Sequence, residues 1–526
     1  MNIWMSRGVC PMRFLLALCP LALSAAAHGE WMEASSPHFV VYADDSERDV
    51  TKFSEELELY HEAMEVMTGL KLPDPSPSNR VTVFVVSSAR AVQKLYGGDA
   101  RYIGGFYLPR AGRSLAIVPQ VQLLKGPQAQ SMITLMHEYA HHFLISNSTL
   151  PTPRWMGEGA AEFFASAEFP GDGGISVGMP AYQRAGELFW AKDVKVSQLL
   201  DPSAYDQGAH KGFDAFYGKS WLLYHYLTLG GERPGQLRKY VSLIAQGESS
   251  PQAGRDAFGD LDQLERDLDK YLNQSKMLSA KFAPGKLPIG QVSVRQLTAG
   301  EGAMMPLTIR SRRGVTREQA LELVPEVRKV AAAYPKDPGV LAELAEAEYD
   351  AGNDAAAIAA ADGALAADPK RVNAYVQKGM ALFRQAVDSD DRDKAYTAAI
   401  GPFVALNKLE NDNPLPLVFY FRSFAERGVK PPDQAVLGLM RAAELAPFDL
   451  GLRLNLAEYQ IAAGDYASAR ANLVPIAFDP HGSPISAGAR TLIERIDSGK
   501  PPSAEEAAKI MLPTSDDPGE KAGPAG

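Results

Sequence analysis

The segment His137-Glu-Tyr-Ala-His141 contains the side chains that could bind a metal ion and activate water. Residues four apart share a face of an α-helix, so the imidazoles of His137 and His141 could bind one ion. Glu138, one step around the helix, could reach a water molecule on that ion and accept its proton. The alternative is a helix that carries ordinary surface histidines.

A second pair of carboxylates follows on the chain. Sixteen residues separate His141 from Glu158, and Glu162 comes four residues later. Two histidines and one glutamate, with one position left for water, form a standard catalytic zinc set, which Glu158 would complete. Glu162 could accept the other ring proton of a ligating histidine and hold that ring in position. Two solvated carboxylates are the alternative, but the adjacent Phe163 and Phe164 favour a buried helix.

These residues resemble the gluzincin metallopeptidases, in which a His-Glu pair is followed by a glutamate on a downstream helix. The segment Trp155-Met-Gly-Glu-Gly159 looks like the Trp-Leu-Asn-Glu-Gly turn of that clan. Residues 213–227 are similar to a segment of uncharacterised bacterial gluzincin-like proteins that often carry tetratricopeptide repeats.

The resemblance covers about residues 31–275 and implies a zinc site with named roles. His137, His141 and Glu158 would bind Zn²⁺, and Glu138 would be the base. The spacing to Glu158 is shorter than in better-known members, so Glu162 stays open as an alternative third ligand.

The resemblance also implies peptide hydrolysis. Gluzincins often use a downstream tyrosine to stabilise the oxyanion, and Tyr217 is the candidate here; a core tyrosine packed with Trp221 and Tyr224 is the alternative. His210 and His225 are weaker candidates, and His142 is expected to face away from the metal. Residues 105–118 could form an edge strand that pairs with extended peptide, or a plain structural strand. The glutamate motif of aminopeptidase relatives is absent from this stretch, which favours an endopeptidase.

The elements that must position these residues can be read from periodicity. Strands are expected at residues 38–42 and 81–86 and a further extended piece at 104–118. A helix capped by Ser46 should end at Gly69, and residues 130–273 read as largely helical. These elements predict an α+β domain over residues 28–275, which the gluzincin resemblance implies is a zincin-like catalytic domain. An all-α tetratricopeptide-type superhelix is expected to follow it.

Prolines mark a repeat in the second half of the chain. They recur with steps of 34, 45, 33 and 33 at Pro335, Pro369, Pro414, Pro447 and Pro480. A step near 34 is the period of tetratricopeptide helix pairs, whose stacking makes a curved binding surface; an irregular helical bundle is the alternative. Repeats are expected over residues 316–495, with an insertion near residues 388–392. Residues 276–315 are expected to be a small connector, with a possible strand at 306–310.

The two ends of the chain and its composition indicate where the protein acts and what it binds. Arginines, an apolar run and small residues over 1–27 describe a signal peptide cleaved near Ala27, and residues 496–526 read as a flexible tail. The 526 residues carry a net charge of −10, and both cysteines lie in the leader. Because the chain is acidic, binding to nucleic acid is not expected. No later segment is apolar enough to span a membrane. Disulfides cannot support the fold.

The sequence therefore predicts a periplasmic or secreted zinc metallopeptidase that acts on a peptide or protein substrate. Its repeats should bind a protein partner or present substrate. The alternative is a non-catalytic tetratricopeptide scaffold with a structural or inactive zinc site.

Overall fold

The computed structural model describes residues 30–97, 103–119, 130–147, 150–207, 213–480, 482 and 484–511. The predicted leader lies outside these ranges, as do His210 and the last 15 residues of the predicted tail. Within the described part of the chain, no helix is long and apolar enough to cross a membrane.

A twisted sheet forms the centre of the N-terminal half. Six strands pair in the order β4-β5-β3-β2-β1-β8, and a separate pair joins β6 to β7. Strands β2, β3 and β5 are parallel, whereas β4, β1 and β8 run antiparallel to their neighbours. The strands are β1 (Trp31–Ser35), β2 (Phe39–Asp44), β3 (Val81–Val86), β4 (Phe106–Leu108), β5 (Leu115–Pro119), β6 (Ile175–Val177), β7 (Ala280–Phe282) and β8 (Ser293–Gln296).

Helices dominate the rest of the N-terminal half, as expected for residues 130–273. Short 3₁₀ turns at Pro77–Asn79 and Tyr182–Arg184 add to them. The helices are α1 (Glu47–Thr68), α2 (Ala89–Tyr96), α3 (Gln130–Asn147), α4 (Arg154–Ala165), α5 (Ala185–Trp190), α6 (Val196–Leu200), α7 (Pro202–Gln207), α8 (Phe216–Leu229), α9 (Gln236–Ala245), α10 (Ser250–Phe258) and α11 (Leu261–Leu272).

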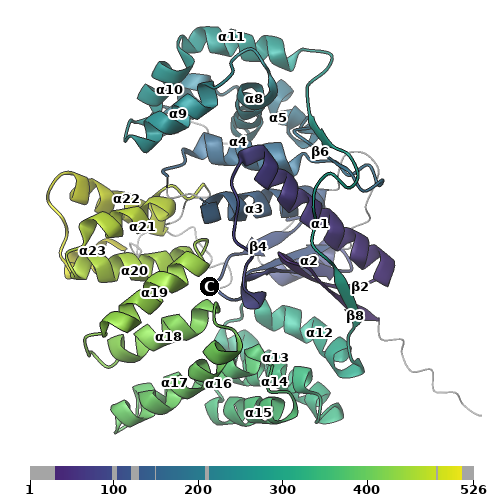
Figure 1. The fold of residues 1–526 in the computed structure, drawn as a ribbon, viewed down its shortest axis with the longest axis vertical. Helices are drawn as coiled ribbons and strands as arrows, with labels where there is room; N and C mark the ends of the chain where they lie inside the picture. Colours follow the sequence, from purple (N-terminus) through teal and green to yellow (C-terminus); the bar gives the residue numbers. More distant parts are fainter. Residues whose placement is uncertain are drawn as a thin grey trace, which may run out of the picture.

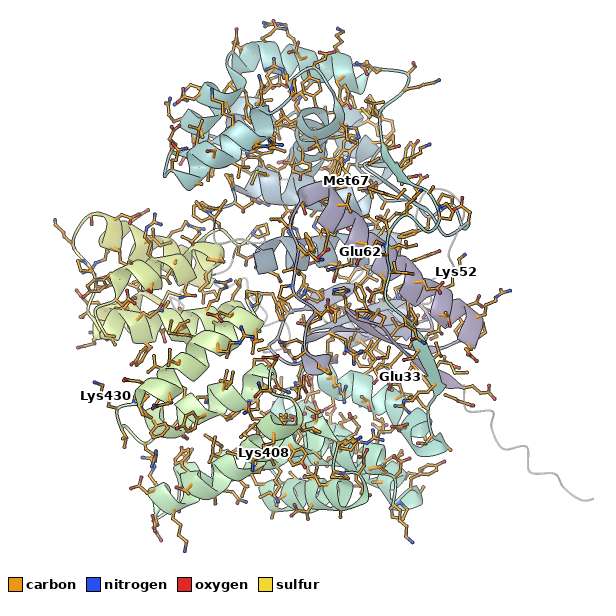
Figure 2. All side chains as sticks on the ribbon, in the orientation of Figure 1. Glu33, Lys52, Glu62, Met67, Lys408 and Lys430 are labelled. Atoms are coloured by element: carbon orange, nitrogen blue, oxygen red, sulfur yellow. The ribbon has the colours of Figure 1, made fainter. Side chains whose placement is uncertain are left out.

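Both faces of the sheet are covered, because alternate side chains along each strand point in opposite directions. Val81 and Val83 pack in the large core that includes α1 and α3. Phe84 and Ile117 pack on the other face, with residues of α2 and α12. Helix α1 crosses the sheet; Lys52, Glu62 and Met67 mark its course in Figure 2.

The predicted boundaries of α1 are confirmed. The Ser46 hydroxyl accepts a hydrogen bond from the Asp49 amide at 3.2 Å, which caps the first turn. Gly69 ends the helix in the left-handed region, with φ of 70°. The strand predicted at residues 81–86 is also confirmed, and the one at 38–42 is shifted to 39–44.

The connector prediction needs two corrections. Residues 306–310 are helical, not a strand, because they lie within α12 (Ala299–Arg312), which a Thr298–Glu301 capping box starts. The alternating residues near Val294 form β8, which pairs with β1 and extends the sheet. Residues 276–315 therefore complete the sheet layer, since α12 also covers one of its faces.

The second half of the described chain is an array of antiparallel helix pairs, which confirms the helical-repeat prediction. Neighbouring helices pack in sequence order, and the array curves around the sheet in Figure 1, along its lower and left sides. The helices are α13 (Arg317–Ala333), α14 (Pro338–Asp350), α15 (Asp354–Ala367), α16 (Val372–Val387), α17 (Arg392–Leu409), α18 (Pro414–Ala425), α19 (Asp433–Leu445), α20 (Leu450–Ala462), α21 (Tyr466–Ala477), α22 (Pro484–Asp497) and α23 (Ala504–Met511).

Two expectations about the array differ from the structure. The long 45-residue step is taken up mainly by helix length, because α16 and α17 have 16 and 18 residues where α14 and α15 have 13 and 14. The predicted flexible tail begins with α23, where Ala507 and Met511 are buried against the last helix pair. Apolar packing therefore orders this part of the tail despite its polar composition.

Candidate metal centre

Helix α3 presents its histidines from a buried position. Met132, Leu135 and Phe143 pack it into the main core, and the Tyr60 hydroxyl donates to the Met136 carbonyl at 2.8 Å. The four-residue spacing places His137 and His141 on one face, where both are buried. Their Nε2 atoms lie 3.1 Å apart.

Helix α4 brings the carboxylates to that face. Pro151 and Pro153 precede it, as expected for a new helix start, and α4 packs against both α3 and α8. At Gly159 a Cβ atom would lie 2.4 Å from the Ser220 carbonyl oxygen of α8. Only glycine allows this close approach, which fixes the neighbouring Glu158 opposite the histidines.

Three side chains converge at this point. One donor atom each from His137, His141 and Glu158 lies within 4.8 Å of the others, and all three residues are buried. The Glu158 Oε2 atom lies 3.3 Å from Nε2 of His137 and 3.4 Å from Nε2 of His141. Two imidazoles and a carboxylate are the donors that zinc prefers, and the set leaves one tetrahedral position for water.

Burial and hydrogen bonding act in opposite directions on these groups. Burial would raise the pKa of Glu158, but its hydrogen bonds and ionic contacts with His137 and His141 hold it well below the ordinary value. Burial would lower the pKa of His137, yet the contacts with Glu158 and Glu162 raise it to about 10. The carboxylate of Glu158 is therefore charged and paired with the two histidines, which would release a proton when a metal ion binds.

Glu162 lies behind His137 and outside the converging set. Its Oε1 atom lies 3.0 Å from Nδ1 of His137, the ring nitrogen turned away from Glu158. Arg184 contacts the same Oε1 at 2.5 Å, and the Gln183 amide donates to Oε2 at 3.0 Å. Burial would raise the pKa of Glu162, but these partners lower it to about 2. This geometry suits the positioning role rather than that of third ligand.

Arg184 and Gln183 are the residues that sequence reasoning missed. Arg184 also contacts Glu187 at 2.6 Å, and the carboxylate of Glu187 accepts from the Gly218 amide at 2.9 Å. Arg184 thereby links Glu162 to α5 and α8. No motif or spacing in the sequence marks it, since its position depends on how α5 packs.

Tyr217 lies near the converging set, on α8. The Arg184 guanidinium carbon is 4.7 Å from the centre of its ring. Burial, and next the charge of Glu158, raise the pKa of its hydroxyl, which therefore stays protonated at neutral pH. Glu138 is half-buried, and its charge is one of the causes, after burial, that raise the pKa of Tyr107 on β4. Of the two residues expected to act on substrate, Glu138 thus lies on α3 between the histidines and Tyr217 lies on α8.

His142 and His225, two further histidines of the described chain, have other partners. Nδ1 of His142 lies 2.5 Å from the Tyr107 hydroxyl, and its ring packs on Phe448. His225 is buried, with Nε2 2.8 Å from the Gly178 carbonyl oxygen and Nδ1 2.9 Å from the Tyr271 hydroxyl. His142 therefore faces away from the three donors, as expected, and His225 is committed elsewhere.

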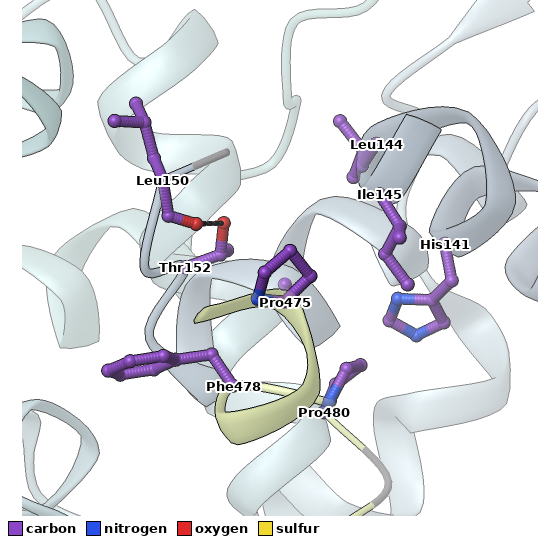
Figure 3. A pocket seen from close by; sticks show the side chains of 9 residues that line it. His141, Leu144, Ile145, Leu150, Thr152, Pro475, Phe478 and Pro480 are labelled. Atoms are coloured by element: carbon purple, nitrogen blue, oxygen red, sulfur yellow. Dashed lines mark hydrogen bonds between the residues drawn. The ribbon is translucent and has the colours of Figure 1, made fainter. Parts of the chain in front are cut away.

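The repeat array reaches the same helices. A pocket of about 40 Å³ lies beside His141 and is lined by α3, by the segment before α4 and by the end of α21. Figure 3 shows Pro475 and Pro480 of the array facing His141 and Ile145 across it. A Cβ atom on Gly157 would lie 3.8 Å from Pro480, so the array packs directly against the start of α4.

Comparisons with known proteins gave no match by sequence and only distant matches by structure. No protein-family model and no curated protein matches the sequence. The solved structure of MamA, residues 41 to the end, from Desulfovibrio magneticus RS-1 is 14% identical with a TM-score of 0.28, and the match covers 35% of this chain and 98% of that one. TTC0263, a tetratricopeptide protein of Thermus thermophilus, is 18% identical with a TM-score of 0.31, and the match covers 37% of this chain and 97% of that one.

Proposed function

We propose that this protein is a zinc-dependent metallopeptidase with a gluzincin-like catalytic domain in its N-terminal half. The observation that carries the proposal is the convergence of His137, His141 and Glu158 next to Glu138. Two imidazoles and one carboxylate beside a further glutamate are the donor set and base that a catalytic zinc site requires, whereas a scaffold has no need of them. The catalytic domain would include residues 28–275 together with β8 and α12.

The three converging residues would hold Zn²⁺. When bound, the ion lowers the pKa of a water molecule and polarises the substrate carbonyl. Glu138 would accept the proton of the attacking water and return it to the leaving amine. Tyr217, protonated at neutral pH, would donate a hydrogen bond to the developing oxyanion.

Glu162 and Arg184 would orient the site. With the carboxylate of Glu162 accepting from Nδ1–H of His137, the Nε2 atom would be left to bind the metal once it has lost its proton. Arg184 pairs with Glu162 and compensates its charge inside the protein. This pairing also holds Glu162 away from the donor set.

Strand β4 supports an extended peptide as the substrate. It lies at the edge of the main sheet among the described strands, with β5 on its other side. A substrate strand could add there through main-chain hydrogen bonds, which fits an endopeptidase. The signal peptide expected over residues 1–27 supports a periplasmic or secreted location.

The second candidate is a non-catalytic scaffold in which the repeats bind protein. The size of the array favours it, since ten or more of the described helices belong to repeats. In this reading the metal site would be structural or idle. Intact Glu138 favours the enzyme.

Metal analysis and peptide cleavage separate the two candidates. We expect the purified mature protein to contain one zinc per chain and to cleave members of a random peptide library. Glu138→Gln should retain the zinc and lose cleavage by about a hundredfold or more. If the wild type binds one zinc per chain but cleaves no peptide, the scaffold is favoured. If it binds no zinc, the assignment of the metal ligands is refuted for both the catalytic and the structural site.

A further inference from the structure

The turn between β4 and β5 is seated on the inner face of the array. We define this face by α14, α18, α19 and α20 together with the loops 410–413 and 446–449. Ala111, at the tip of the turn, is only 8% exposed and packs in an apolar cluster with residues of α19 and α20. Its amide donates to the Asp449 carboxylate at 2.8 Å. The turn is therefore held by both apolar and polar contacts.

Neighbouring residues fix the turn from both sides. The Gly112 amide donates to the Asn79 side chain at 2.8 Å, and Asn79 in turn donates to the Leu445 carbonyl at 3.0 Å. Ser78 donates to both oxygens of the Glu410 carboxylate, from its amide at 2.8 Å and its hydroxyl at 2.7 Å. These contacts join segments more than 300 residues apart.

Arg113 of the turn pairs with a buried carboxylate of the array. The Arg113 guanidinium lies 3.0 Å from the Glu346 carboxylate, which is almost fully buried on α14. Glu343 lies one turn earlier on the same helix and pairs with Arg312 of α12. Two buried carboxylates on one helix need positive partners, and Arg113 supplies one from outside the array.

The turn is linked through β4 to α3, the helix that carries His137 and His141. It follows β4, whose Tyr107 hydroxyl contacts His142, the residue after His141. Phe448 of the array packs on the same His142 ring, with centroids 4.4 Å apart. Ile145 of α3 packs against the array cluster as well. The array, strand β4 and helix α3 are thus joined by one continuous set of contacts.

We infer that the inner face of the array is a binding site for an arginine-bearing turn, and that residues 109–114 of the same chain occupy it. The array therefore acts within the molecule, where it positions β4 and α3, and another protein cannot use this face while the turn is seated. A partner with a similar basic turn would have to displace it. The inference rests on contacts within the chain and does not depend on peptidase activity.

The test releases the turn in the full-length protein. Ala111→Asp places a carboxylate in an apolar pocket beside Asp449, so the turn should leave its site. A fluorescent peptide with the sequence of residues 108–115 should then bind about tenfold or more tightly to this variant than to the wild type. Replacing the arginine of the peptide that corresponds to Arg113 should weaken its binding about tenfold. Binding is measured by fluorescence polarisation, without zinc.

Ala355→Asp is the matched control, because it makes the same change at an exposed position in the first turn of α15. It should bind the peptide no better than the wild type. Equal binding by the wild type and Ala111→Asp would overturn the inference. So would a failure of Ala111→Asp to bind the peptide when hydrogen exchange shows that residues 106–119 have been released.

A milder variant covers the case in which Ala111→Asp does not fold. Arg113→Ala leaves the tip of the turn in place but removes one partner of Glu346, which Arg312 and Asn373 also contact. Amide exchange over residues 106–119 should become about tenfold faster than in the wild type. Arg470→Ala, which removes an exposed ion pair with Asp497 elsewhere in the array, should leave it unchanged. Unchanged exchange in Arg113→Ala would contradict the inference.

Discussion

Glu162→Gln is predicted to weaken zinc binding by about 10- to 100-fold while leaving the fold intact. The substitution keeps the size of the side chain but removes its charge. In the wild type one oxygen of Glu162 lies 3.0 Å from Nδ1 of His137 and 2.5 Å from Arg184. A glutamine oxygen is a weaker acceptor for both groups, and Arg184 loses a buried counter-charge.

The magnitude follows from the kind of bond that is lost. A charge-assisted hydrogen bond is worth about 1.5–3 kcal/mol, compared with about 1 for a neutral one. Each 1.4 kcal/mol that is lost from the interaction of His137 with zinc lowers the zinc affinity about tenfold. Loss of the ring orientation lowers the affinity further, which gives the expected range of 10- to 100-fold.

The assay titrates metal-free protein with zinc against a chromophoric chelator at constant pH. Glu187→Gln is the matched control, since Glu187 also pairs with Arg184 but does not contact His137. It should change zinc affinity less than threefold. Equal affinities for the two variants would refute the positioning role. Complete loss of zinc in Glu162→Gln, with a modest effect of Glu158→Gln, would instead make Glu162 the third ligand.

Two further predictions concern the packing that holds α3 and α4. Burial, and next the charge of His38, lower the pKa of His61 to about 2. As the pH falls, His61 therefore becomes protonated in the unfolded chain before it does so in the folded protein. The free energy of unfolding should fall by about 2 kcal/mol from pH 6.5 to pH 5 for this reason. In denaturant titrations His61→Asn should lose that part of the decrease, and an unchanged pH dependence would refute this. Gly159→Ala should destabilise the protein by about 1–3 kcal/mol and weaken zinc binding, because the new methyl group meets the Ser220 carbonyl. Gly401→Ala, with no atom within 4 Å of the new group, should be neutral or stabilising, and equal losses in both would count against the close-packing argument.

The three residues of the donor set could be predicted from sequence because they lie close together along the chain. The spacing of His137 and His141 fixes their common face once a helix forms. A short connection with two prolines then forces a second helix back past the first, which brings Glu158 within reach. The alternative ligand, Glu162, lies one helical turn further along, and only the packing of α4 decides between them.

Features that depend on remote packing could not be predicted. Arg184 comes from a short helix whose position depends on α8, and the seat of Ala111 lies on a helix pair more than 300 residues away. The strand expected at residues 306–310 illustrates a local ambiguity. Pro306 with its apolar neighbours reads as extended, whereas the Thr298–Glu301 capping box starts a helix that tolerates this proline.

The contacts of α3 relate the two candidate functions to each other. One face of the helix carries His137 and His141, and another face, at His142 and Ile145, packs on the array. A repeat module that only recruited a partner would have no need to pack on the helix of a metal site. An array that contacts His142 together with β4 instead fixes the position of β4 relative to His137 and His141. Under the proposed function, a peptide paired with β4 would have to present its scissile bond to the metal site, and the repeats would then help to determine the catalytic geometry.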